Sequence, residues 1–162
     1  MIRVGTGFDV HAFDEGRPLI IGGVLVPHAP GLGGHSDADV LSHAVTDGLL
    51  GAAGLGDLGA LYPATDDWKD ASSLSILADA VVRARDAGWV VTNVDCTVIA
   101  EYPKLGEFKD EMKVNLARAL QVEPTAVSVK ATTTDGLGFT GRREGIAAQA
   151  VVLLADSSGM ES

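Results

Sequence analysis

One stretch decides the fold of this chain: Gly34-His35-Ser36-Asp37-Ala38-Asp39-Val40-Leu41-Ser42-His43-Ala44-Val45-Thr46-Asp47. After Ser36 its apolar residues recur near helical spacing, which predicts a helix with one face toward a core. We expect Ser36 or Asp37 to cap this helix by accepting a hydrogen bond from an unpaired backbone N–H group. His35 comes just before the cap, where the start of a helix favours an anion.

Asp39, His43 and Asp47 follow one another at intervals of four residues. At about 100° per residue they fall within an arc of roughly 80°, so they stack along one side of the helix. Such a stack could hold a ligand, or it could be the solvated face of an ordinary helix. The two acids could orient His43 or the first turn of the helix, or they could simply lie on the helix surface.

Residues 2–11 alternate in the manner of a β-strand. Gly7, Asp9 and His11 then share one side of it, because side chains two positions apart point the same way. If His43 packs against that side, a set of one oxygen and two nitrogen ligands results. Three protein ligands with an open fourth position are typical of a catalytic rather than a structural zinc. Other divalent ions suit the same set, so the residues alone leave the metal open.

The composition predicts one domain with a core of its own. The chain has 162 residues, and a hydrophobic content of 46% excludes a disordered protein. Its apolar runs are too short to cross a bilayer, and we expect neither a membrane segment nor a signal peptide. The single cysteine, Cys96, lies in an apolar strand, and we interpret it as a packing residue of a cytoplasmic protein. We assign residues 1–155 to the domain and residues 156–162 to a polar C-terminal tail.

The net charge of −10 limits the partners of this chain. Nucleic acids and anionic membranes need basic patches, so we expect neither as a partner. A phosphorylated small molecule remains compatible with this charge. It would need local cations or metal ions, because the general field repels it.

The remaining patterns complete a fold class. They predict a hairpin over 17–27 turning near Gly22-Gly23, a helix capped by Ser72 or Ser73, a strand over 89–100, a helix with Pro103 in its first turn, and strands over 126–132 and 146–154. The last strand is apolar on both faces, which places it at the centre of the sheet or at a subunit interface. This order predicts a single α+β domain with helices on one face of a mixed β-sheet. The opposite face would be exposed in a monomer, which favours oligomerisation.

The segment 132–145 follows a strand and is rich in hydroxyl groups and glycines, with one aspartate and two arginines. Backbone N–H groups can approach phosphate oxygens where glycine removes the side chain. We interpret this segment as a phosphate-handling loop, although glycine-rich loops are common. Taken alone, the residues therefore indicate metal-assisted phosphoryl transfer on a small molecule.

Five blocks of the chain stand out in order. They are Arg3-Val4-Gly5-x-Gly7-x-Asp9-Val10-His11, Gly34-His35-Ser36-Asp37-Ala38-Asp39, Ala100-Glu101-x-Pro103-Lys104-Leu105, Lys130-Ala131-Thr132-Thr133-Thr134-Asp135 and Gly138-Phe139-Thr140-Gly141-Arg142. Together they resemble the 2-C-methyl-D-erythritol 2,4-cyclodiphosphate synthase family, over residues 2–154. The resemblance implies an α+β homotrimer with active sites between neighbouring subunits. It also implies conversion of 4-diphosphocytidyl-2-C-methyl-D-erythritol 2-phosphate to the cyclic diphosphate with release of CMP, in the non-mevalonate route to isoprenoids.

The resemblance also assigns roles to residues. It implies that Asp9, His11 and His43 bind a metal, usually zinc, and that His35 and Thr133 are catalytic residues that align the reacting phosphates. The substrate contacts that we expect are Asp9, His11, His35, Ser36, Asp57, Leu58, Gly59, Tyr62, Asp66, Ala100, Pro103, Lys104, Thr132, Thr133, Thr134, Asp135, Phe139 and Arg142.

Two residues depart from the family pattern. Asp135 stands where many members have a glutamate that binds a second ion, magnesium or manganese. Its side chain is one methylene shorter, so a water could intervene between the carboxylate and the ion. Arg143 stands where a glycine is usual, and the resemblance places its charge near the trimer axis.

The expected reaction is an in-line attack of the 2-phosphate on the β-phosphorus. It needs alignment and charge neutralisation rather than a strong general base. One alternative is a metal-dependent phosphohydrolase, which would give a linear monophosphate. A second is a non-enzymatic trimer with structural zinc, although the chain lacks the four ligands such sites use. A small-molecule binding protein is a third alternative, but it would not need the metal set.

Overall fold

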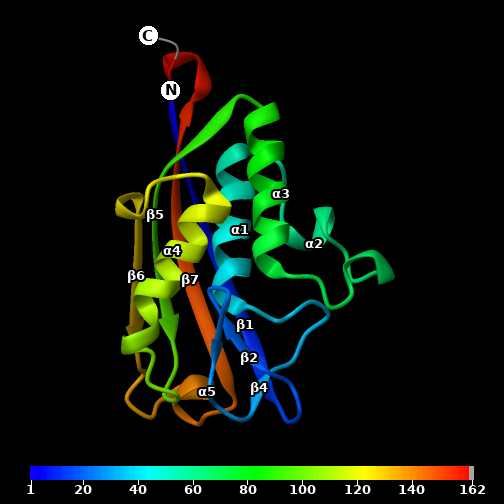
Figure 1. Ribbon diagram of the computed structural model, residues 1–162, viewed down its shortest axis with the longest axis vertical. Coiled ribbons are helices and arrows are strands. Elements are labelled where there is room, and N and C mark those ends of the chain that lie inside the picture. Colours follow the sequence, from blue (N-terminus) through cyan, green and yellow to red (C-terminus); the bar gives the residue numbers. More distant parts are fainter. Residues whose placement is uncertain (161–162) are drawn as a thin grey trace.

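The computed structural model describes residues 1–160 and contains a five-stranded mixed sheet in the order β4-β1-β7-β5-β6 (Figure 1). These strands are β1 (Ile2–Asp14), β4 (Gly31–Leu32), β5 (Trp89–Ile99), β6 (Val127–Thr132) and β7 (Gly145–Asp156). Only the β5–β6 pair is parallel among these neighbours; β1 is antiparallel to β4 and β7, and β5 is antiparallel to β7. The predicted α+β class and the central position of the last strand are confirmed.

Three long helices form a layer over the sheet in Figure 1. They are α1 (Val40–Ala53), α3 (Ser73–Asp86) and α4 (Lys109–Leu120). The short helices are α2 (Leu58–Leu61), α5 (Gly138–Gly141), η1 (Asp66–Trp68), η2 (Gly106–Phe108), η3 (Pro124–Ala126) and η4 (Ser157–Met160). Ser72 caps α3 as predicted, with its side chain accepting from the Ser75 N–H. Within residues 1–160 no helix is long and apolar enough to cross a membrane.

Helix α1 lies directly on β1 because two glycines of that strand leave room for it. A Cβ added at Gly7 would lie 1.8 Å from the Ala44 carbonyl oxygen, and one at Gly5 would lie 2.0 Å from that of Gly48. Helix α1 therefore packs directly against the backbone of Gly5 and Gly7. This close approach brings His43, on α1, to the side of β1 that carries Asp9 and His11.

The opposite side of β1 exposes apolar side chains, as the alternation predicts. Val4 is 61% exposed and Phe8 is 60% exposed, and Val10 and Val151 are also exposed. Apolar side chains that line up on one face of a sheet are typical of a surface that another chain covers.

The start of α1 corrects the sequence analysis. The cap is Asp39, whose side chain accepts from the Ser42 N–H, and not Ser36 or Asp37. Ala38 has a φ of 57°, in the left-handed region, so the helix cannot extend back past it. His35 is therefore not next to the start of the helix. The buried carboxylate of Asp39 occupies the helix N-terminus, where we expected an anion to be favoured.

The buried Asp39 has a second task. It accepts hydrogen bonds from Gly22 N–H and Gly23 N–H, both at 2.8 Å, in the turn between β2 (Leu19–Ile21) and β3 (Val24–Val26). The predicted hairpin is thereby confirmed and tied to α1. The Asp39 carboxylate makes no hydrogen bond to His43; it orients the first turn of α1 through Ser42, and full burial makes the interpretation of Asp39 as a surface acid wrong.

Pro103 was expected in the first turn of a helix, and this is wrong. Helix α4 begins at Lys109 after the turn η2, so Pro103 lies in the loop that follows β5. Met112, Leu116 and Leu120 form the buried side of α4. Of the expected tail, Asp156 ends β7 and residues 157–160 form η4, while residues 161–162 lie outside the described residues.

Candidate functional site

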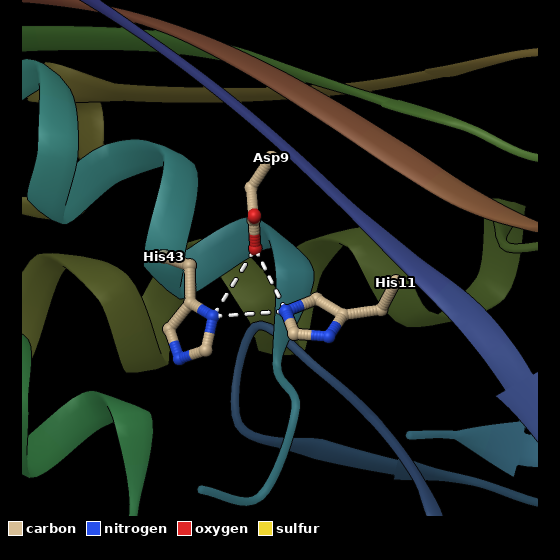
Figure 2. A group of neighbouring side chains, drawn as sticks. All are labelled: Asp9, His11 and His43. Carbon is tan, nitrogen blue, oxygen red and sulfur yellow. Dashed lines mark hydrogen bonds and ion pairs between the residues drawn. The ribbon is translucent and has the colours of Figure 1, made fainter. Parts of the chain in front are cut away.

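Three side chains from two elements meet at the surface between β1 and α1 (Figure 2). Oδ2 of Asp9 lies 2.8 Å from Nε2 of His11 and 3.1 Å from Nδ1 of His43. The two ring nitrogens are 3.1 Å apart. The three residues form the one group of His, Cys, Asp or Glu side chains within residues 1–160 that could hold a metal ion. The sequence prediction that β1 and α1 bring these residues together is confirmed.

The chemistry of this triad suits a cation. The Nδ1–H of His11 donates to the Gly33 carbonyl oxygen at 2.7 Å, because a carbonyl can only accept. In the neutral ring the lone pair on Nε2 therefore points at Asp9 and His43. Two nitrogens and a carboxylate oxygen that converge in this way fit a divalent ion that takes nitrogen and oxygen ligands.

The same contacts shift two pKa values. Burial alone would raise the pKa of Asp9, but the hydrogen bonds that the His11 and His43 rings donate when they are protonated lower it to about 2. Burial alone would lower the pKa of His11, but the hydrogen bond and charge of Asp9 raise it above 6.5. Asp9 is therefore ionised at neutral pH and supplies the negative charge of the triad.

A cavity of about 200 Å³ opens beside the triad. Its wall includes His35, Ser36, Leu58, Tyr62 and Trp68. His35 is exposed, and its Nε2 lies 2.5 Å from the Thr65 carbonyl oxygen. The structure thus gathers the candidate metal ligands and the first group of expected substrate contacts around one cavity.

Two expected contacts fit this cavity less well. The Tyr62 hydroxyl donates to Asp79 Oδ2 at 2.6 Å, so only its ring faces the cavity. Asp66 is exposed in η1 and does not line the cavity, whereas Trp68 from the same turn does. Trp68 packs edge-on against the Tyr62 ring at 5.0 Å, and this contact holds its side chain against the cavity wall.

Asp57, Leu58 and Gly59 line a second hollow beside His43 together with Phe8 and Asp47. Asp57 caps α2 by accepting from the Ala60 N–H at 2.9 Å, and Asp47 accepts from the Leu58 N–H at 3.0 Å. Asp47 therefore holds α2 against α1 and does not orient His43. Neither interpretation left open for Asp47 is therefore correct, because this half-buried carboxylate binds the start of α2.

A larger cavity, of about 310 Å³, lies at the ends of β5 and β6, and we call it the second cavity. Its wall includes the predicted residues Ala100, Pro103, Lys104, Thr132 and Thr133. It shares no residue with the triad cavity. The candidate site residues therefore form two separate groups within one chain.

Sequence reasoning missed two further residues of this second cavity. Lys109, the first residue of α4, lines it and adds a positive charge beside Lys104. Glu101 supports its rim, because its carboxylate accepts from Gly136 N–H at 2.9 Å and from Thr134 N–H at 3.3 Å. A backbone–carboxylate contact of this kind leaves no local pattern in the sequence, since its partners are more than thirty residues away.

The other residues of the loop lie outside the cavity wall. Thr134 donates its hydroxyl to the Leu137 carbonyl oxygen at 2.7 Å. The exposed Asp135 accepts from the Thr133 hydroxyl at 3.2 Å. Phe139 and Arg142 are also exposed, and Arg142 pairs with Glu144 at 2.8 Å. None of the four residues Thr134, Asp135, Phe139 and Arg142 lines either cavity.

A family model, described as the YgbB family, matches residues 2–155. The chain belongs to the YgbB family. The 2-C-methyl-D-erythritol 2,4-cyclodiphosphate synthase of Salinibacter ruber is 62% identical to this YgbB chain over 150 residues, which cover 92% of this chain and 96% of the relative. The synthase of the same name from Geobacillus thermodenitrificans is 58% identical over 158 residues, covering 97% and 99%.

Solved structures of similar chains share the fold of this YgbB chain. The bifunctional IspDF of Campylobacter jejuni matches with a TM-score of 0.92 and 47% identity, covering 98% of this chain and 44% of that one. IspF of Plasmodium falciparum, solved as a CDP complex, matches with a TM-score of 0.83 and 32% identity, covering 96% of both chains.

Proposed function

We propose that this chain is a 2-C-methyl-D-erythritol 2,4-cyclodiphosphate synthase. It converts 4-diphosphocytidyl-2-C-methyl-D-erythritol 2-phosphate to the cyclic diphosphate and releases CMP, as a lyase of the non-mevalonate pathway. The observation that carries the proposal is 62% identity to a synthase of this name over almost the whole chain. The triad beside a cavity and a lysine-lined second cavity supply groups that such a substrate needs.

Asp9, His11 and His43 would hold the metal ion, which we propose to be zinc. When bound, such an ion neutralises charge on the phosphates and orients them. We propose that a second ion, magnesium or manganese, accompanies the diphosphate and that Asp135 binds it directly or through water. The Thr133 hydroxyl donates to Asp135, which supports joint action of these two residues.

The residues of the chain then have mainly to hold one folded conformer of the substrate. The nucleophile and the leaving group belong to the same molecule, and a phosphate nucleophile is already ionised. We propose that His35 and Thr133 align the reacting phosphates. Lys104 and Lys109 supply positive charge where the cytidine diphosphate part binds, in a chain whose net charge is otherwise −10.

We further propose a homotrimer in which the two cavities meet across a subunit boundary. Within one chain the cavity at the triad and the cavity at Lys104 share no residue, which supports a substrate site that two chains build together. The exposed apolar side of β1, with Val4 and Phe8, is a surface suited to such packing. A cytoplasmic location is part of the same proposal.

Phosphorus NMR of the purified protein with the diphosphocytidyl 2-phosphate substrate tests the reaction. We expect a cyclic diphosphate and CMP, both lost with EDTA and in His43→Ala. His28→Ala is the matched control, because His28 bonds within its own loop to the Pro30 carbonyl and lies outside the triad. A linear monophosphate would establish the phosphohydrolase instead, and absence of turnover with zinc and magnesium present would refute the assignment.

Mixing two inactive variants tests the shared site. His43→Ala damages the triad and Lys104→Ala damages the second cavity. If neighbouring chains combine the two cavities, mixed oligomers contain some intact sites, and activity returns on mixing. If each chain carries a complete site, mixing restores nothing.

A further inference from the structure

We propose that Ser73 and Asp37 are positioning residues that hold His43 in the tautomer that a metal ion requires. The inference rests on the metal site proposed above and concerns the nitrogen of His43 that faces away from it. Ser73, the first residue of α3, is fully buried. Its Oγ lies 2.8 Å from Nε2 of His43, and Nδ1 of the same ring faces Asp9.

The contacts of Asp37 decide which way these hydrogen bonds run. The Ser73 hydroxyl bonds to Oδ1 of Asp37, and the Ser73 backbone N–H donates to Oδ2 of the same carboxylate at 3.1 Å. An ionised carboxylate can only accept, so the Ser73 hydroxyl donates its single proton to Asp37. Its oxygen is then left as an acceptor toward the imidazole.

The tautomer of His43 follows from this order. Nε2 carries the proton and donates it to the Ser73 oxygen, with Ser36 Oγ as a second neighbour at 3.0 Å. Nδ1 therefore carries the lone pair that faces Asp9 and His11. A hydrogen bond to the outer nitrogen is the usual means by which proteins orient a histidine ligand and raise its basicity.

His11 is oriented by different means. Its outer nitrogen donates to the Gly33 carbonyl, a fixed backbone acceptor in the loop before α1. His43 instead depends on two side chains that join this loop to the start of α3. The inner nitrogens of both rings are thus left unprotonated by partners that lie outside the triad.

A purely structural role is the competing interpretation. Asp37 also accepts from the Asp39 N–H at 3.2 Å and donates its own N–H to the Ala71 carbonyl at 3.1 Å, so it joins the loop to the segment before α3. In that case its loss would change stability without changing the tautomer of His43. The test must therefore read the ring directly.

The first measurement is nitrogen NMR of histidine-labelled, metal-free protein at mildly alkaline pH. We expect a protonated Nε2 and an unprotonated Nδ1 at His43 in the wild type. In Ser73→Ala this preference is expected to weaken. Ser72→Ala is the matched control, because Ser72 is exposed and caps the same helix without contacting His43.

The second measurement is zinc affinity by competition with a chelator. Loss of such an outer contact weakens metal binding by about 10- to 100-fold, and we expect this of Ser73→Ala and Asp37→Asn but not of Ser72→Ala. If Asp37 acts through Ser73, the double variant binds zinc no more weakly than Ser73→Ala alone.

Each contrary result has a distinct meaning. Three results would each overturn the positioning role of Ser73 and Asp37 while leaving the metal site intact. They are Nδ1 protonation in the wild type, unchanged zinc affinity in folded Ser73→Ala, and additive losses of zinc affinity in the double variant. Should Ser73→Ala fail to fold, the wild-type spectrum and Asp37→Asn carry the test. A wild-type protein that binds no zinc would overturn both the metal site and the positioning role of Ser73 and Asp37.

Discussion

The guanidinium carbon of Arg143 lies 4.1 Å from the ring centroid of Tyr102. Tyr102 is 44% exposed and precedes Pro103, which lines the second cavity. Lys104 approaches the same ring at 5.2 Å. Two cations thus flank an aromatic ring in the loop that we propose binds the cytidine part. This contact shows a neighbour of Arg143 that the sequence did not indicate.

Removing the Arg143 side chain should loosen this loop. An exposed cation–π contact contributes about 0.5–1 kcal/mol, so we expect Arg143→Ala to raise the Kd for CDP by about 2- to 5-fold. Titration calorimetry would measure it, with the exposed Arg118→Ala on α4 as the control. Arg143 has a φ of 60°, so Arg143→Gly should lose the same affinity while being more stable than Arg143→Ala. Unchanged CDP binding would show that the contact does not support the loop.

Gly7→Ala tests the close packing of α1 on β1. The added Cβ would meet the Ala44 carbonyl oxygen at 1.8 Å, so the helix must move away from β1. We expect the free energy of unfolding to fall by about 3 kcal/mol or more, with loss of metal binding. Gly51→Ala, on α1, is the control, because its added Cβ meets nothing within 4 Å. This variant should raise the free energy of unfolding by about 0.5–1 kcal/mol. Denaturant unfolding distinguishes the two; equal stabilities would contradict the packing argument.

Asp39→Asn tests the link between α1 and the hairpin. Each carboxylate oxygen of Asp39 accepts two hydrogen bonds, from Gly22 and Ser42 N–H groups on Oδ1 and from Gly23 N–H and the Ser42 hydroxyl on Oδ2. An amide group replaces one acceptor by a donor and leaves buried donors unpaired. We expect a loss of about 2–3 kcal/mol in the free energy of unfolding. Asp86→Asn, at an exposed position of α3, should change the free energy of unfolding little. Equal losses in Asp39→Asn and Asp86→Asn would refute the link between α1 and the hairpin.

Asp9→Asn tests the cause of the raised pKa of His11. In metal-free protein we expect the His11 pKa to fall in this variant, because burial remains while the charge of Asp9 is lost. Proton NMR of the histidine ring during a pH titration would measure it.

The same pair also contributes to stability in a defined pH window. Asp9 has a lowered pKa, so its contribution is present above pH 3.8 and is lost toward pH 2; His11 has a raised pKa, so its contribution is present below pH 6.5 and is lost as the pH rises through the folded value. The stability gap between wild type and Asp9→Asn should therefore be widest between pH 3.8 and 6.5. A gap that does not vary with pH would contradict the assignment.

Local patterns were sufficient for most of the long elements and for the grouping of Asp9, His11 and His43. Asp9 and His11 share a side because strand side chains alternate, and His43 belongs to a helix whose apolar period is clear. The same patterns failed at the start of α1. There Arg17 donates to the carbonyl oxygens of Gly34 at 3.0 Å and Ser36 at 2.6 Å, so these carbonyls are engaged outside any helix. A contact across seventeen residues has no signature in a local window.

By itself, the sequence determined which chemical groups the chain carries and which side of each strand or helix presents them, because periodicity depends only on backbone geometry. Only the tertiary structure decided what each group does. Of three stacked residues, Asp39 holds a hairpin, His43 joins the triad and Asp47 holds α2, since each meets a different neighbour. Ser73 reaches His43 only because α3 begins beside α1. Distances between side chains far apart in sequence follow from packing, and packing is a property of the whole chain.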